Sequence, residues 1–92
     1  MTQQTVDSPP HRPKLSRLYK LQWEPVQDSF VLLYPEGMVK LNQSAAEILK
    51  RCDGARDSVA IASDLEASFS LSGLQADVDD FLAVARERGW VS

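Results

Sequence analysis

Apolar and polar residues alternate along the first third of the chain. In residues 18–24, Tyr19, Leu21 and Trp23 fall on one face of an extended chain, and polar residues lie between them. A period of two predicts a strand with one solvated face. Residues 29–34 are apolar on both faces, so we expect them to form the middle strand of a sheet.

A third strand follows a tight turn. Pro35 pre-sets the first turn position, and we expect Gly37 to take the left-handed conformation that closes a short hairpin. The strand that returns antiparallel consists of Met38, Val39, Lys40 and Leu41. The simplest sheet is therefore a three-stranded meander in which residues 38–41 form an outer strand.

Beyond residue 42 the apolar spacing becomes that of helices. The first helix begins near Asn42, where either Asn42 itself or a Ser44–Glu47 capping box satisfies the free N–H groups, and Gly54 ends it. The second helix begins at residue 57 or 58. Its apolar face consists of Ile61, Ala62, Leu65 and Phe69.

The third helix carries the clearest signals. Ser72 and Gln75 offer a second capping box, and Gly89 ends the helix so that Trp90 folds back near Ala85. An apolar arc about 100° wide faces the core. That arc consists of Leu74, Val78, Phe81, Leu82 and Ala85. The order β-β-β-α-α-α predicts an α+β fold, a three-stranded antiparallel sheet followed by three helices, of the winged-helix kind.

Composition limits the class of protein. A chain of 92 residues is one domain, and 43% apolar with 25% charged residues is ordinary for a globular protein. Residues 1–16 are rich in proline and poor in apolar residues, so we expect a flexible arm ahead of a domain at residues 17–92. No apolar run resembles a membrane span or an export signal, which favours a cytoplasmic protein.

Catalytic and metal chemistry find little support. The chain has one cysteine, Cys52, and one histidine, His11, and the histidine lies in the expected arm. A Cys–His metal site or nucleophile–base pair is therefore disfavoured. The acidic residues of the third helix have no partner nucleophile. We expect no cofactor, no metal site and no enzymatic activity.

Longer motifs carry more information. The chain contains LLYPEG at residues 32–37, LNQSAAEIL at 41–49, CDG at 52–54 and DVDDFLAVARERGW at 77–90. Together they resemble the PqqD family of small proteins in pyrroloquinoline quinone (PQQ) biosynthesis, over about residues 16–92. The resemblance implies a fold of three strands and three helices with no catalysis of its own.

The resemblance also implies partners. PqqD domains recognise leader regions of ribosomally made peptides. Here that implies that the precursor peptide PqqA is held for the radical-SAM enzyme PqqE, which cross-links a Glu and a Tyr of the peptide. In related domains the peptide adds as a strand to the third β-strand, in a groove walled by the third helix.

Two features of the residues favour the same place. A short outer strand leaves backbone groups with which a peptide, or a second copy in a homodimer, can pair. On the third helix Val84 lies outside the core arc, between Asp77 and Arg88, whereas the other flank has no such apolar residue. The expected peptide-binding residues are Met38, Val39, Lys40, Leu41, Asp77, Phe81, Val84 and Arg88.

Two other functions fit parts of the sequence. A winged helix permits nucleic-acid binding, but residues 1–17 hold three of the ten basic residues and one of the thirteen acidic ones, so the remainder is acidic. An acidic domain repels phosphates. The tripeptide at residues 57–59 resembles the phosphopantetheine site of acyl or peptidyl carrier proteins, with Ser58 as the attachment point. A helix N-cap explains the same residues.

Overall fold

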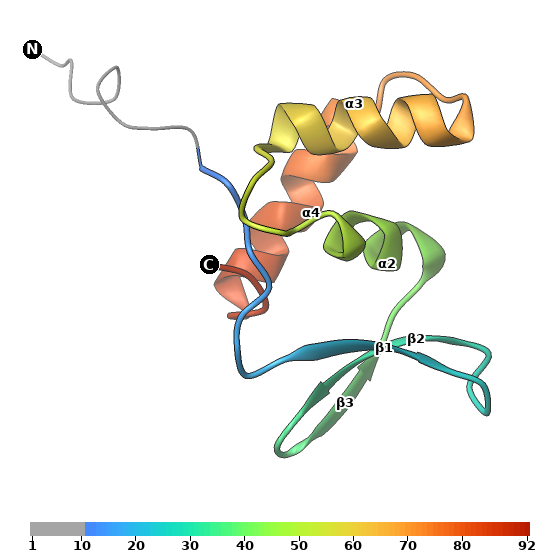
Figure 1. The fold of residues 1–92 in the computed structure, drawn as a ribbon, viewed down its shortest axis with the longest axis vertical. Coiled ribbons are helices and arrows are strands. Elements are labelled where there is room, and N and C mark those ends of the chain that lie inside the picture. Colours follow the sequence, from blue (N-terminus) through green and yellow to red (C-terminus); the bar gives the residue numbers. More distant parts are fainter. Residues whose placement is uncertain (1–10) are drawn as a thin grey trace, which may run out of the picture.

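The computed structural model describes residues 11–92 (Figure 1). Its elements are β1 (Lys20–Glu24), β2 (Ser29–Tyr34), β3 (Gly37–Lys40), α2 (Gln43–Lys50), α3 (Ser58–Phe69) and α4 (Gln75–Glu87). The strands form one antiparallel sheet in the order β1-β2-β3. The predicted α+β fold, with its antiparallel sheet ahead of the helices, is confirmed.

The helices lie on one side of the sheet (Figure 1). Helix α2 packs against β1 and β2 and also contacts α3, while α4 packs against α3. One cluster of buried apolar side chains joins these layers, with Leu32 of β2 and Ile61 of α3 fully buried. Tyr19 and Leu21 pack against this cluster as their alternation predicts, whereas Trp23 remains 48% exposed.

Of the caps and turns predicted around β3 and α2, one is confirmed and two are wrong. Asn42 is the N-cap of α2, because its Oδ1 accepts a hydrogen bond from the Ala45 N–H at 2.8 Å. The Ser44–Glu47 capping box is therefore wrong. The left-handed conformation expected at Gly37 is also wrong, since Gly37 is the first residue of β3 and its φ of 159° is close to extended.

The start of α4 is held by α3 rather than by its own cap. The Glu66 carboxylate of α3 accepts a hydrogen bond from the Leu74 N–H at 2.8 Å. The Gln75 side chain donates to the Ser58 hydroxyl at 3.4 Å. The predicted Ser72–Gln75 box is wrong, because Leu74 rather than Ser72 is the N-cap of α4 and the Gln75 side chain bonds Ser58. Helix α3 itself begins at Ser58 with Asp57 as its cap, within the predicted limits.

Residues 13–16 form an extended segment that we call the strap. It lies between the loop that follows α2 and the C-terminal segment that follows α4 (Figure 1). Its backbone exchanges two hydrogen bonds with Ser92, at 3.3 and 3.0 Å, through Lys14. Leu15 donates to the Cys52 carbonyl at 3.2 Å, and Ser16 donates to the Trp90 carbonyl at 2.8 Å.

The strap corrects two expectations. We expected residues 13–16 in a flexible arm, but Pro13 is fully buried and accepts a hydrogen bond from the Gly54 N–H at 3.0 Å. Residues 1–10 of the expected arm lie outside the described residues. Gly54 does not end α2, which stops at Lys50 with Arg51 as its C-cap; instead Gly54 bends the loop beneath the strap.

A network of charged groups joins α2 to α3. Arg51 Nε donates to Asp64 at 2.5 Å, and its Nη1 donates to the Glu47 carboxylate at 2.9 Å. Lys50 pairs with the same carboxylate at 2.9 Å. The hydrogen bonds from Lys50 and then Arg51 lower the pKa of Glu47, and the hydrogen bond from Arg51 lowers the pKa of Asp64.

We expect Arg51→Met to lower the free energy of unfolding by about 1–2 kcal/mol at neutral pH, because charged hydrogen bonds between two helices are lost. Glu47 and Asp64 have folded pKa values below their unfolded ones, so their stabilisation is present above the unfolded values and is lost as the pH falls through the folded ones. The difference in Tm between parent and variant should therefore shrink below about pH 4.

The matched control for this experiment is Arg56→Met. Arg56 lies 4.0 Å from Asp53, and both side chains are at least 40% exposed, so their pairing should contribute little. Thermal melts of the three proteins between neutral and acidic pH make the comparison. A loss of stability that is equal for both variants, or independent of pH, would show that the Arg51 network does not join the helices energetically.

Candidate peptide-binding site

Strand β3 has one hydrogen-bonded side and one free side. The Leu41 N–H donates to the Phe30 carbonyl at 3.0 Å, so these two residues form a hydrogen-bonded pair. Hydrogen-bonded and non-hydrogen-bonded pairs alternate along an antiparallel ladder. The backbone groups of Val39 therefore also face β2, and those of Met38 and Lys40 point outward. No other strand within residues 11–92 pairs with this edge.

The side chains of the outer strand divide in the same way. Met38 is 46% exposed, and Lys40 is exposed. Val39 lies opposite Leu32 and packs against the core, although it remains half-buried. Leu41 is a core residue, only 6% exposed, and its N–H is used by β2. Leu41 therefore presents neither its side chain nor its N–H at the free edge of β3.

The flank of α4 is arranged as the sequence predicts. Asp77, Val84 and Arg88 are exposed, Val84 by 41% of its surface. Phe81 is half-buried against the core, with its ring centroid 6.2 Å from that of Trp90. The Arg88 guanidinium lies 5.6 Å from the same Trp90 ring. These residues form one strip, which we call the α4 flank.

The structure does not bring β3 and α4 into close contact. Strand β3 packs on β2, and α4 packs on α3. Val39 and Phe81 nevertheless border the same core cluster, from the sheet and from the helix respectively. The predicted residues of β3 and those of α4 therefore lie on separate elements that border the same core cluster.

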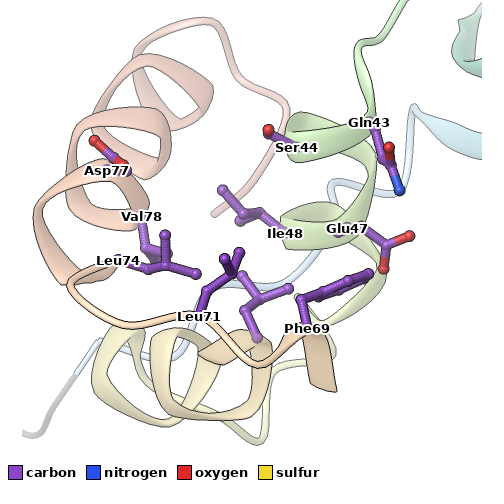
Figure 2. Close-up of a pocket in the computed structure, with 10 residues that line it drawn as sticks. Gln43, Ser44, Glu47, Ile48, Phe69, Leu71, Leu74, Asp77 and Val78 are labelled. Carbon is purple, nitrogen blue, oxygen red and sulfur yellow. The ribbon is translucent and has the colours of Figure 1, made fainter. Parts of the chain in front are cut away.

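An open apolar pocket of about 280 Å³ lies at the N-terminal end of α4, between α2 and α3 (Figure 2). We call it the apolar pocket. It is lined by Gln43, Ser44, Glu47, Ile48, Leu65, Phe69, Leu71, Leu74, Asp77 and Val78. Asp77 is the one predicted site residue in this lining.

Sequence reasoning missed the apolar pocket. We expected Phe69 on the core face of the second helix, but it is the last residue of α3 and is 42% exposed. Leu71 follows a left-handed Ser70 and is 55% exposed. The sequence does contain a signal for the pocket. Phe69 and Leu71 are large apolar residues at and just beyond the end of a helix, where no further helical turn can cover them.

Cys52 and the metal-binding types of side chain are the remaining candidates for reactive chemistry. Cys52 is 5% exposed, and its thiol donates to the Ile48 carbonyl at 3.3 Å. Burial, with a smaller effect of Asp53, raises the pKa of Cys52 to about 11, so the thiol is a poor nucleophile at neutral pH. Within residues 11–92 no cluster of three or more His, Cys, Asp or Glu side chains is placed to hold a metal ion. None of the helices described is long and apolar enough to cross a bilayer.

Comparison with known proteins decides the family. The family model described as coenzyme PQQ synthesis protein D (PqqD) matches residues 29–91. The chain belongs to the PqqD family. The resemblance carried by the sequence motifs is thereby confirmed, and the matched residues include β3, the apolar pocket and the α4 flank.

Individual PqqD relatives agree with this assignment. A protein of Azotobacter vinelandii named PqqA binding protein is 55% identical over 80 residues, which cover 86% of this chain and 87% of the relative. A protein of the same name from Methylococcus capsulatus is 44% identical over 78 residues, with coverage of 85% and 84%. The solution structure of the PqqD part of Methylobacterium extorquens PqqCD, described as a functional, stand-alone RiPP recognition element, superposes with a TM-score of 0.73 and 28% identity over 87% of each chain.

Proposed function

We propose that this chain is a non-catalytic adaptor that binds a PqqA-like precursor peptide as an added strand on β3 and presents it to a PqqE-like radical-SAM enzyme. The observation that carries the proposal is the free edge of β3 in a chain whose relatives are named PqqA binding proteins. The peptide and the enzyme are the partners, and the chemistry belongs to the enzyme.

The free edge supplies the backbone contacts. An extended peptide beside β3 pairs with the outward N–H and C=O groups of Met38 and Lys40. These bonds fix the position of the peptide along the strand but do not distinguish one sequence from another. Selection of the sequence must come from side chains that neighbour the edge.

The α4 flank supplies side-chain contacts. Val84 and the half-buried Phe81 offer an apolar strip, and Asp77 and Arg88 place opposite charges at its two ends. A peptide lying between β3 and α4 would bury Val84 and the exposed part of Met38. Such burial stabilises the complex, since removal of apolar surface from water contributes about 25 cal/mol per Å².

Amide chemical shifts test the proposal. Isotope-labelled protein is titrated with a synthetic PqqA precursor peptide, and we expect the largest shifts at Met38, Lys40 and along the α4 flank. Strand β1 forms the other outer edge of the sheet. There the backbone groups of Leu21 and Trp23 point outward, because the residues between them bond β2. Shifts confined to that edge would place the peptide on β1 and contradict strand addition on β3.

Homodimerisation by strand exchange would use the same edge. A β3–β3 pair between two copies and a β3–peptide pair exclude one another, because each outward backbone group bonds one partner. Light scattering with and without the peptide separates the two. A dimer formed through β3 should dissociate as the peptide saturates, whereas a dimer formed elsewhere should persist.

Val84→Asp separates the flank from the core. Val84 is 41% exposed, so the charge should leave the Tm near that of the parent. Loss of one apolar contact of about 1–2 kcal/mol, with a carboxylate placed in a partly desolvated groove, should weaken peptide binding about tenfold. Fluorescence anisotropy of a labelled peptide measures the affinity.

Ala83→Asp is the matched control for Val84→Asp. Ala83 is exposed on the far side of α4, about 180° around the helix from Leu74, and should bind the peptide like the parent. Parent-like affinity of both variants would remove the α4 flank from the site. A collapse of the Tm of Val84→Asp would show that Val84 belongs to the core.

A further inference from the structure

We propose that the apolar pocket receives one large apolar side chain of the same peptide, from a residue next to the segment that pairs with β3. This inference rests on the proposed function and extends it, because it adds a specificity site that backbone pairing does not provide. The occupant is an aliphatic or aromatic side chain rather than a separate small molecule. Four features of the pocket carry the argument.

The pocket has an unpartnered apolar surface on a fixed frame. Phe69 and Leu71 leave 42% and 55% of their surfaces exposed, above a floor that includes the buried Ile48, Leu65 and Val78. Figure 2 shows Ile48 of α2, Phe69 of α3, Leu71 of the segment that joins α3 to α4, and Val78 of α4 converging on the pocket.

The exposed rim is held by hydrogen bonds. The N–H of Leu71 donates to the Glu66 carbonyl at 2.9 Å, and the Glu66 carboxylate accepts from the Leu74 N–H at 2.8 Å. Both ends of the connection between α3 and α4 are therefore tied to one residue of α3. A rim fixed in this way needs little ordering when a side chain enters, which lowers the entropic cost of binding.

The position of the pocket connects it to the proposed groove. Strand β3 leads through Leu41 and Asn42 into Gln43 and Ser44, the first residues of α2, and both line the pocket. The α4 flank begins at Asp77, which also lines it. The edge of β3 and the flank of α4 thus lead to the same place from two elements. The opposite side of α4, with Asp79 and Arg86, borders a different pocket.

The size and the lining select the kind of occupant. A volume of about 280 Å³ lies at the lower limit of the roughly 300–1,000 Å³ typical of sites for small-molecule ligands, and it is large enough for one large side chain. No basic residue lines the pocket, and the acidic Asp77 is part of its lining. An acidic side chain is therefore disfavoured. A single apolar anchor in a pocket, beside a strand that provides register, is a common way to obtain specificity.

Leu71→Asp tests the pocket on the side of the protein. Leu71 is more than half exposed, so the variant should melt near the parent temperature, while its affinity for a synthetic PqqA precursor peptide should fall about tenfold. The matched control is Val59→Asp, an apolar residue of α3 that is 62% exposed and lies outside the apolar pocket. Its affinity should equal that of the parent.

The peptide identifies the occupant. Each apolar residue of the peptide is replaced by Ala in turn, and binding is measured to the parent and to Leu71→Asp. We expect one replacement to weaken binding to the parent about tenfold and to have little further effect on the variant, because the same contact is already lost. That residue should adjoin the segment whose amides are protected by β3.

The outcomes distinguish the two proposals. If Leu71→Asp and Phe69→Ala bind like the parent while Lys40→Pro loses affinity, the pocket is not used and strand addition stands. If the pocket variants bind like the parent and no peptide residue couples to Leu71, the inference is wrong even where the peptide binds tightly. If the parent does not bind the peptide, or Lys40→Pro binds like the parent, strand addition fails and the pocket inference fails with it.

Discussion

Lys40→Pro should reduce peptide affinity by at least tenfold while the domain stays folded. The Lys40 N–H points away from β2, and proline is tolerated on an edge strand where the missing N–H faces solvent. The added peptide loses one ladder donor and meets the proline ring at the edge. A lost hydrogen bond of about 1 kcal/mol combined with this steric block gives an expected loss of roughly 10- to 100-fold.

Val39→Pro is the matched comparison for Lys40→Pro. The Val39 N–H faces β2, so proline there removes a bond within the hairpin and leaves the Leu32 carbonyl without its partner. We expect a loss of stability of about 1–3 kcal/mol, seen as a lower Tm. Peptide anisotropy and thermal melts on both variants decide the matter. Equal destabilisation of the two, with full affinity retained by Lys40→Pro, would rule out strand addition on β3.

Deletion of residues 1–16 should unfold the domain or lower its Tm by more than about 15 °C. The deletion removes the strap, with five backbone hydrogen bonds to the loop after α2 and to the C-terminal segment, and the buried Pro13. At about 0.5–1.5 kcal/mol each, five bonds approach the 5–15 kcal/mol of stability of a whole domain. A loss of 1 kcal/mol lowers the Tm of a domain of this size by about 4–8 °C.

Deletion of residues 1–10 is the control, since it leaves the strap intact. We expect its Tm to stay within a few degrees of the parent, as measured by circular dichroism. The strap is also connected to the α4 flank. The strap bonds the Trp90 carbonyl, and Trp90 contacts both Phe81 and Arg88 of the α4 flank. A Tm that is unchanged by removal of residues 1–16 would show that the strap contributes nothing to the fold.

Periodicity predicted the elements because burial decides them. Alternation placed Tyr19 and Leu21 against the core, and the 3.6-residue spacing placed Val78, Leu82 and Ala85 on the buried side of α4. Val84 was placed outside that arc by the same geometry and is exposed. These predictions needed only the spacing of neighbouring residues and whether each side chain is apolar or polar.

The errors arose where distant residues compete for a local group. The Ser72–Gln75 box had the right spacing, but the Gln75 side chain bonds Ser58 of α3 instead. The strap has the composition of a flexible arm, yet Leu15 pairs with Val91, far along the chain. Neither partner is visible in a window of neighbouring residues. In both cases contacts with distant residues determine the structure, although the local sequence was typical of a capping box or of a flexible arm.

The candidate site was predictable in part for the same reasons. A meander of three strands implies an outer strand, so the place of β3 followed from the sequence. Which of its residues point outward depends on the pairing register, and only the Leu41–Phe30 bond assigned Lys40 to the free side and Leu41 to the core. The apolar pocket depends on where α3 stops, which is the least certain part of a periodicity argument.

The strap places the two ends of the described chain together, since Lys14 and Ser92 exchange backbone hydrogen bonds. A circular permutant of residues 11–92 then needs only a short linker to join the original ends, with new ends opened at the exposed β1–β2 turn around Val26. For the same reason, a protein fused directly before His11 and one fused directly after Ser92 would be attached at neighbouring points on the surface. Either order of fusion therefore leaves the partner on the same part of the domain.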